Sequence, residues 1–266
     1  MSQLATYLQY GPALYPTALL LFEKALANAE EALGPTNPDT GIHLNNLALL
    51  YKVTGDYDAA LPLYQRALAI AEKEQGQEHP STGMCLNNLA ELYRALGDYN
   101  AALPLYQRAL AIAEKIQGPE HSNTARCLNN LGLLYHQSGD YDAALPLLQS
   151  SLSIAEKTHG AEHISVGVYM NNLATLYDVT RDYASALPLY QRALAIAEKA
   201  QGPAHPETGT SLNNLAGMYK SIGDYDAAMP LYQRALAIVE KALGLAHPNT
   251  KTCRANLTDL QAKMPS

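Results

Sequence analysis

Apolar residues recur along this chain in an arrangement that repeats every 42 residues. In each copy, a first stripe of apolar positions falls on one side of a helical wheel. In the copy that begins near residue 40, this stripe consists of Leu44, Leu47, Ala48 and Tyr51. A second stripe with the same spacing consists of Tyr57, Ala60, Leu61, Tyr64, Ala67, Leu68 and Ala71. The pattern predicts two amphipathic helices in every copy.

Residues between the stripes predict where the helices begin and end. Gly55 can adopt the left-handed dihedrals that end a helix, and Asp56 can cap the start of the second helix. Pro80 suits the first position of the next helix, directly after His79. We expect His79 and its equivalents to cap or cover the junction between copies. These equivalents are His121, His163, His205 and His247.

The repeat predicts how the chain is organised. Each full copy contains a pair of asparagines, at 45–46, 87–88, 129–130, 171–172 and 213–214. A fixed period of this length is typical of stacked helix pairs rather than one closed globule. We therefore expect a degenerate repeat over residues 1–38, five full repeats over 39–248, and a capping helix with its tail over 249–266.

Composition and charge narrow the classes of partner. The chain has 266 residues, of which 48% are hydrophobic, as in ordinary folded proteins. A net charge of −7 argues against nucleic acid or an anionic membrane as the main partner. No apolar run reaches the roughly 18 to 20 residues of a membrane span, and the N-terminus lacks a secretory pattern. We expect a cytoplasmic protein.

Candidate redox, metal and catalytic groups are sparse. Cys85, Cys127 and Cys253 occupy equivalent positions, which in stacked helices lie at least about 8 to 10 Å apart, too far for a disulfide. We expect these thiols to be buried, and the repeated histidines to be too far apart to share a metal ion. The chain also lacks a phosphate-binding glycine loop and a nucleophile elbow. We therefore expect no metal, no cofactor and no enzymatic activity.

The order of small and large residues in each copy resembles the tetratricopeptide repeat. The matching residues are Leu44, Leu47, Ala48, Tyr51, Gly55, Tyr57, Ala60, Tyr64 and Ala67. The 42-residue period, with Leu-Asn-Asn-Leu-Ala and a Gly-x-x-His-Pro loop, is similar to the long variant of kinesin light chains and many bacterial proteins. The resemblance implies an all-α fold, a right-handed α-solenoid of antiparallel helix pairs. It also implies that the first helices line a concave groove.

A helical wheel indicates which residues of the first helices face that groove. The first asparagine of each pair points toward it, and a row of such amides can grip the backbone of an extended peptide. This row consists of Asn45, Asn87, Asn129, Asn171 and Asn213. Leu49 also points to the groove centre, and Glu91 and Leu133 are its equivalents in the next two copies. The alternative is that the asparagines tie adjacent helices together.

Charged residues at the groove rim suggest a class of ligand. Equivalent positions along the stack hold Lys52, Arg94, His136, Asp178 and Lys220. Arg126 lies on the same helices, so we expect the groove to be locally positive in an otherwise acidic protein. We hypothesise an acidic or carboxylate-bearing peptide as ligand. The alternative is a set of solvated surface charges.

Three non-enzymatic functions fit these features. The leading one is a protein-interaction scaffold that binds a peptide in the groove. The second is a regulatory or sensor segment of a larger signalling or caspase-like peptidase protein. The third is a self-associating or engineered repeat array, because nearly identical units can stack end to end. We expect a monomer or weak self-association.

Overall fold

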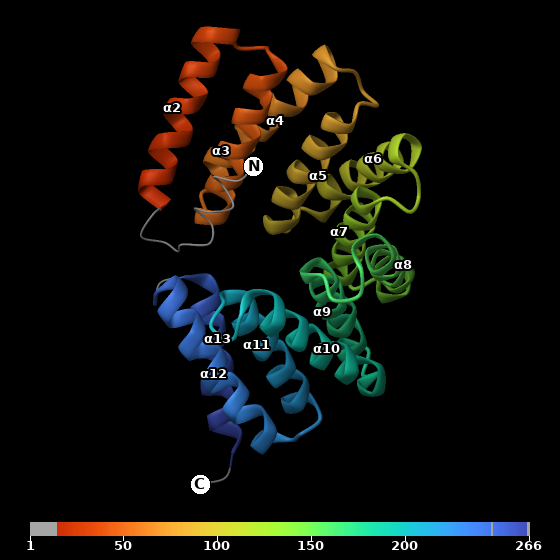
Figure 1. Ribbon diagram of the computed structural model, residues 1–266, viewed down its shortest axis with the longest axis vertical. Helices are drawn as coiled ribbons and strands as arrows, with labels where there is room; N and C mark the ends of the chain where they lie inside the picture. Colours follow the sequence, from red (N-terminus) through yellow and green to blue (C-terminus); the bar gives the residue numbers. More distant parts are fainter. Residues whose placement is uncertain (1–14, 246, 265–266) are drawn as a thin grey trace. The chain divides into compact units, whose positions relative to one another are not determined.

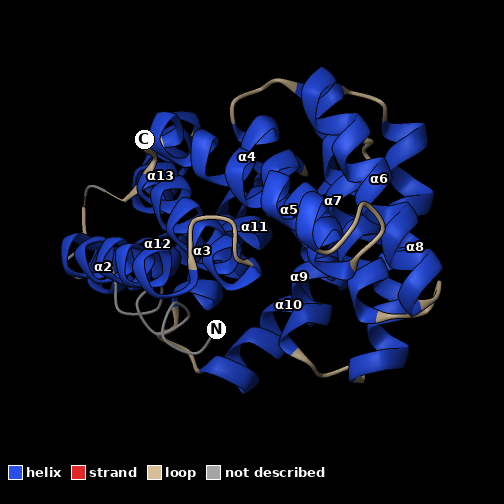
Figure 2. Ribbon diagram, turned by 90° about the horizontal axis from the view of Figure 1, so that it is seen from above, coloured by secondary structure: helices blue, strands red, loops and turns tan. Residues whose placement is uncertain are grey.

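The computed structural model describes residues 15–245 and 247–264, and it divides the chain into two compact units between Asp140 and Tyr141. This division falls inside the third full repeat, between its two helices. Figure 2 shows helices joined by loops throughout the described part, and no strand there. The first part of the expected degenerate repeat, residues 1–14, lies outside the described residues.

Each unit is a series of helices that alternate in direction (Figure 1). Unit 1 contains α2 (Tyr15–Leu33), α3 (Pro38–Thr54), α4 (Tyr57–Glu74), α5 (Pro80–Ala95), α6 (Tyr99–Gln117) and α7 (Ser122–Ser138). Unit 2 contains α8 (Tyr141–His159), α9 (Ile164–Val179), α10 (Tyr183–Gln201), α11 (Pro206–Ser221), α12 (Tyr225–Leu243) and α13 (Pro248–Lys263). Within each unit the helix pairs stack as a right-handed α-solenoid, which confirms the predicted all-α class.

The core joins each repeat to the next one. One cluster combines Leu44 of α3 and Ala67, Ile70 and Ala71 of α4 with Cys85 of α5. The same cluster recurs one period later and again in unit 2. Its members there are Leu86, Ala109, Ile112, Ala113 and Cys127, and then Leu212, Ala235, Val239, Leu243 and Cys253. Each repeat therefore buries its apolar residues partly against its neighbour, and the predicted burial of the cysteines is confirmed.

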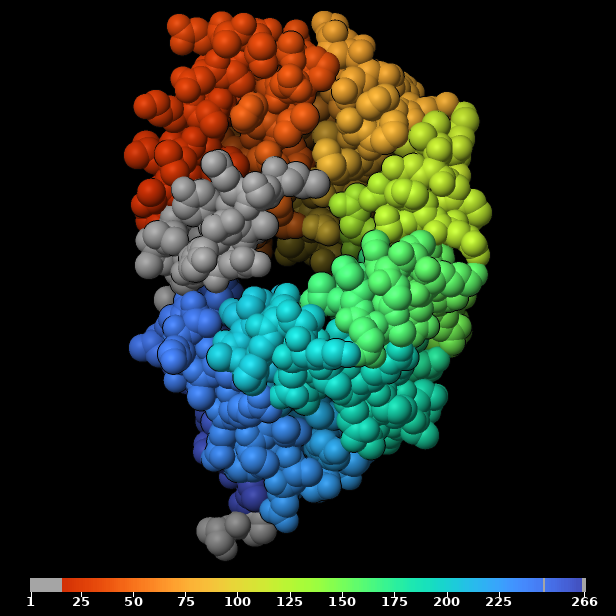
Figure 3. Space-filling view, in the orientation of Figure 1, coloured from red at the N-terminus to blue at the C-terminus, as the bar shows by residue number. Residues whose placement is uncertain are grey.

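Small residues let the two helices of a repeat approach closely. A Cβ atom added at Gly83 of α5 would lie 3.2 Å from Cγ2 of Ile112 in α6. At Gly209 the corresponding distance to Cγ1 of Val239 is 2.9 Å, which no real Cβ contact allows without movement. The space-filling view shows the successive segments of unit 1, from red to yellow-green, in direct contact (Figure 3).

The predicted helix ends are confirmed. Gly55 has φ of 85° and ends α3, and the Asp56 carboxylate accepts a hydrogen bond of 3.1 Å from the backbone N–H of Ala59. His79 caps α5, because its Nδ1 accepts from the backbone N–H of Ser81 at 3.2 Å. The same histidine cap recurs at His121, His163, His205 and His247.

A buried threonine fixes the loop between repeats, and the sequence pattern did not reveal its role. The Thr82 hydroxyl donates a hydrogen bond of 2.7 Å to the carbonyl oxygen of Gly76. Equivalent bonds of 2.8 Å link Thr40 to Gly34, Thr124 to Gly118 and Thr208 to Gly202. Its signal was present in the sequence as a threonine three residues after four of the five junction histidines, with Val166 following His163.

The tyrosines of the second helices fill the space between helices, but their hydroxyl groups differ. Tyr64 is fully buried, and its hydroxyl has no hydrogen-bond partner in the described part of the chain. Tyr190 is equally buried, yet its hydroxyl donates to Oγ1 of Thr175 at 3.0 Å. Burial raises the pKa of both phenols, so neither ionises near neutral pH.

We predict opposite effects of removing these two hydroxyl groups. Tyr64→Phe removes a buried polar group without a partner, so the free energy of unfolding should stay the same or rise. Tyr190→Phe removes a hydrogen bond and should lower it by about 0.5 to 1.5 kcal/mol. Urea denaturation followed by circular dichroism measures both values. Equal losses in the two variants would contradict the assigned hydroxyl environments.

The fourth repeat contains a strained residue at the turn between its helices. Arg181 has φ of 62°, whereas the equivalent turns contain glycine, as at Gly139 with φ of 86°. A side chain in this left-handed region costs about 1 kcal/mol. We expect Arg181→Gly to raise the free energy of unfolding by about 0.5 to 1 kcal/mol, measured by the same denaturation experiment. A loss of stability would show that the Arg181 side chain compensates for its backbone.

Candidate functional site

The first helices of unit 1 form one continuous face. The helices α3, α5 and α7 contact one another in turn, and their half-buried and exposed residues form what we call the α3–α5–α7 face. Three of the predicted groove asparagines belong to these helices, but their side chains are largely closed to solvent. Asn45 is 5% exposed, Asn87 is 1% exposed and Asn129 is 5% exposed.

These asparagines form an amide ladder between successive repeats. Nδ2 of Asn88 donates to Oδ1 of Asn45 at 2.9 Å, and Nδ2 of Asn130 donates to Oδ1 of Asn87 at 3.0 Å. Asn130 also donates to Oε1 of Glu91 at 3.1 Å. In unit 1, Asn88 and Asn130 therefore each hold the first asparagine of the preceding repeat.

Unit 2 contains a looser form of the ladder. Nδ2 of Asn256 donates to Oδ1 of Asn213 at 3.0 Å, whereas Asn171 donates to the hydroxyl of Ser211 at 3.1 Å. Asn171 and Asn213 are half-buried. The structure thus differs from the expectation of five amides open to a peptide, because buried partners already occupy the ladder in unit 1. Tying adjacent helices is the role that the hydrogen bonds show.

The predicted rim residues also reach across to the next repeat. Lys52 forms an ion pair of 2.5 Å with Glu91, and Lys220 forms one of 2.5 Å with Asp259. Arg94 instead donates to Oε1 of Gln137 at 2.9 Å. Two of the expected cations are therefore neutralised by carboxylates of the neighbouring helix.

The side chains at two other rim positions, His136 and Asp178, are not cations at pH 7. Burial lowers the pKa of His136 below its usual value, so the imidazole is neutral at pH 7. Burial raises the pKa of Asp178, and a hydrogen bond from Ser221 opposes that shift. The neutral His136 and the two ion pairs limit the predicted local positive charge to fewer positions than the sequence suggests.

Positive charge without a neutralising partner remains in unit 1. Arg94 and Arg126 have no carboxylate within ion-pair distance in the described part of the chain, and Nε of each is buried without a hydrogen bond. Arg126 donates only to Oδ1 of Asn123, at 3.4 Å. Of the apolar groove residues, Leu49 packs against the core beside Tyr64, and Leu133 is half-buried.

The sequence matches the model of one protein family along most of its length. The tetratricopeptide repeat model matches residues 13–73, 42–115, 84–157, 135–199 and 170–241. The chain belongs to the tetratricopeptide repeat family. Proteins of this family bind protein partners, so this array is an interaction scaffold in that general sense. No curated protein sequence matches the chain.

Solved structures with the same fold include kinesin-light-chain-like proteins. BtubC (BKLC) from P. vanneervenii is 25% identical, with a TM-score of 0.63 over 96% of this chain and 93% of that one. A putative kinesin light chain from Podospora anserina with nearly identical repeats is 28% identical, with a TM-score of 0.62 over 77% and 97%. A Rap protein complexed with Competence and Sporulation Factor is 15% identical, with a TM-score of 0.65 over 94% and 71%, which shows the fold alone.

The second helices of the tetratricopeptide array carry a further set of ties that sequence analysis missed. Arg108 of α6 forms an ion pair with Glu72 of α4 and donates to the carbonyl oxygen of Gln77 at 3.3 Å. Equivalent pairs join Arg66 to Glu30, Arg192 to Glu156 and Arg234 to Glu198. The recurrence of arginine and glutamate at fixed positions was the available signal.

Other classes of site have no support in the described part of the array. No group of three side chains that could hold a metal ion is found among the residues described. Across those same residues, no helix is both long and apolar enough to cross a membrane.

We predict that the amide ladder stabilises the array as coupled pairs. Asn87→Ala and Asn130→Ala should each lower the free energy of unfolding, because each removes a buried hydrogen bond of the ladder. In a double-mutant cycle the two changes should show a coupling of about 0.5 to 3 kcal/mol. Asn46→Ala is the control, because Asn46 is the equivalent of Asn130 in the first full repeat and has no hydrogen bond to another described residue. Additive losses at Asn87 and Asn130 would contradict the ladder.

Proposed function

We propose that the α3–α5–α7 face binds an acidic peptide segment of a partner protein. The observation that carries this proposal is the pair of guanidinium groups at Arg94 and Arg126, neither of which has a carboxylate partner among the described side chains. Nε of each is already withdrawn from solvent, so a ligand carboxylate would gain charge-assisted hydrogen bonds at a low cost of desolvation.

The charge balance favours unit 1 over unit 2 as the binding region. At the predicted groove positions of unit 1, the cations Lys52, Arg94 and Arg126 accompany one carboxylate, Glu91, which pairs with Lys52. In unit 2 the one rim cation, Lys220, pairs with Asp259, and Asp178 adds a carboxyl group. Long-range attraction of an acidic segment therefore favours unit 1.

The amides of the predicted groove take a secondary part in this proposal. Asn45 and Asn87 hold the first helices in register, and the bond from Asn130 to Asn87 joins α7 to α5, the helices that carry the two arginines. Leu49 and Leu133 supply apolar surface on either side of Glu91, which repels carboxylates from its own position. A cytoplasmic location, in keeping with the net charge of −7, belongs to the same proposal.

A peptide titration tests the proposal. We expect a fluorescein-labelled peptide with several Glu residues to bind the full chain, and the matched peptide with Gln in their place to bind at least about tenfold more weakly. Arg94→Glu should weaken binding of the Glu peptide by a similar factor. Lys73→Glu is the control. Lys73 is exposed on α4, outside the α3–α5–α7 face, and its replacement by Glu changes the charge by the same amount. Fluorescence anisotropy measures the affinities.

Added salt gives a second readout of the same binding. Affinity should fall as ionic strength rises, because charge attraction at a half-exposed face is screened. Equal affinity for the Glu and Gln peptides, or equal losses in the Arg94→Glu and Lys73→Glu variants, would remove the acidic-peptide assignment. Binding of neither peptide would remove this face as their binding site.

A further inference from the structure

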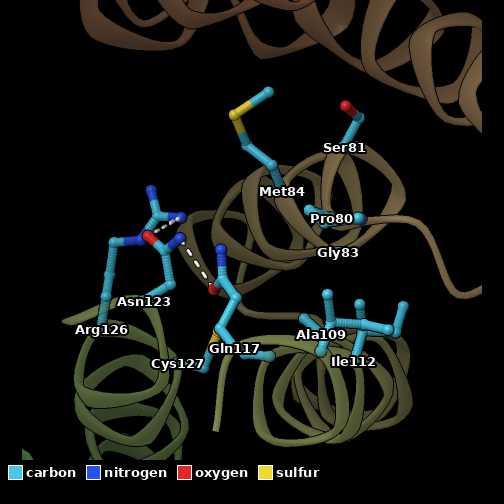
Figure 4. Close-up of a pocket in the computed structure, with 12 residues that line it drawn as sticks. Pro80, Ser81, Gly83, Met84, Ala109, Ile112, Gln117, Asn123, Arg126 and Cys127 are labelled. Atoms are coloured by element: carbon cyan, nitrogen blue, oxygen red, sulfur yellow. Dashed lines mark hydrogen bonds between the residues drawn. The ribbon is translucent and has the colours of Figure 1, made fainter. Parts of the chain in front are cut away.

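Unit 1 contains a cleft that the sequence pattern did not predict. It has a volume of about 280 Å³ and lies between the start of α5, the second half of α6 and the start of α7 (Figure 4). Its walls are largely apolar and include Met84 of α5 and Ala109, Ile112 and Ile116 of α6. The absence of a side chain at Gly83 brings the α5 backbone to the edge of the cleft.

One corner of the cleft is polar and positively charged. Arg126 donates to Oδ1 of Asn123, and Nδ2 of Asn123 donates to Oε1 of Gln117 at 2.9 Å, as the dashed lines of Figure 4 show. These bonds occupy the two amide oxygens that face the guanidinium. Among the described residues, no acidic side chain lines the cleft. The corner therefore offers N–H donors and a positive charge to an anion.

The size and the charge of this cleft both differ from those of the equivalent place one repeat earlier. The equivalent position one repeat earlier is a space of about 20 Å³, where Ile42 and Met84 stand in place of Met84 and Arg126. The position of Arg126 is occupied by Val168 and Thr210 in the later full repeats. Neither of these side chains can bind an anion by charge. The junction of α5, α6 and α7 therefore combines a larger cleft with a cationic side chain.

We propose that this cleft binds a small monocarboxylic acid with a branched apolar tail. The tail lies against Met84 and Ile112, and the carboxylate accepts hydrogen bonds from the Arg126 guanidinium. A volume of about 280 Å³ is at the lower end of small-ligand pockets, which favours a compact molecule over a folded partner. Burial of the apolar tail and the charge-assisted hydrogen bond to the carboxylate then both stabilise the bound acid. This goes beyond the peptide-binding proposal and does not need it.

Methyl NMR on the full chain tests the assignment with 4-methylpentanoate as the probe. With labelled Met and Ile methyl groups, we expect the acid to shift the signals of Met84, Ile112 and Ile116. The amide of the same acid, 4-methylpentanamide, should bind at least about tenfold more weakly. Arg126→Met should weaken binding of the acid by a similar factor. This variant introduces methionine, the residue at the equivalent position 84 one repeat earlier, so we expect the fold to tolerate it.

Controls separate this site from the proposed peptide face. Arg94→Met should leave binding of the acid unchanged, since Arg94 does not line the cleft. The tripeptide Ser-Gly-Leu with a free C-terminus tests whether the cleft instead takes a chain end, and it should bind more weakly than the acid. The proposal would be overturned if the acid caused no shifts, or if the amide caused shifts equal to those of the acid. It would also be overturned if Arg126→Met bound the acid with unchanged affinity, or if the tripeptide bound more tightly than the acid. The effect of Arg94→Glu on acidic-peptide binding tests only the peptide proposal, so the two proposals can fail independently.

Discussion

The stability of each unit depends on apolar burial that is shared between consecutive repeats. A cluster such as Leu44, Ala67, Ile70, Ala71 and Cys85 takes its members from three helices, the last of which belongs to the next repeat. A single helix pair therefore leaves part of its apolar surface uncovered. Close helix approach at positions such as Gly83 makes this shared burial tight. The alignment of the helices, and with it every surface feature, follows from that contact.

Polar ties on both sides of the stack fix this alignment. On the first helices, the buried amide ladder links Asn87 to Asn130, and on the second helices Arg108 clamps Glu72 of the preceding repeat. Groups that act in this way are already satisfied within the chain and have little left for a ligand. The residues proposed for recognition, Arg94 and Arg126, instead vary between repeats and have no carboxylate partner among the described side chains.

Local features of the fold could be predicted from the sequence, whereas distances between repeats could not. The turn at Gly55, the caps at Asp56 and His79 and the buried Cys85 follow from residue type and helical spacing. A helical wheel gave the direction of Asn87 but not its distance from Asn130, so it could not show that the amide is buried. The same limit applies to the cleft, whose volume depends on how α5, α6 and α7 pack.

Removal of one internal period tests the central claim of nearest-neighbour stacking most directly. Deletion of residues 58–99 joins Tyr57 to Asn100 and keeps the helical register, because it removes one complete period of 42 residues. The account predicts that helical content per residue, measured by circular dichroism, is retained. It also predicts that the denaturant m-value falls roughly in proportion to the length removed. Loss of helical signal from the remaining chain would contradict it, because contacts beyond adjacent repeats would then be required for folding.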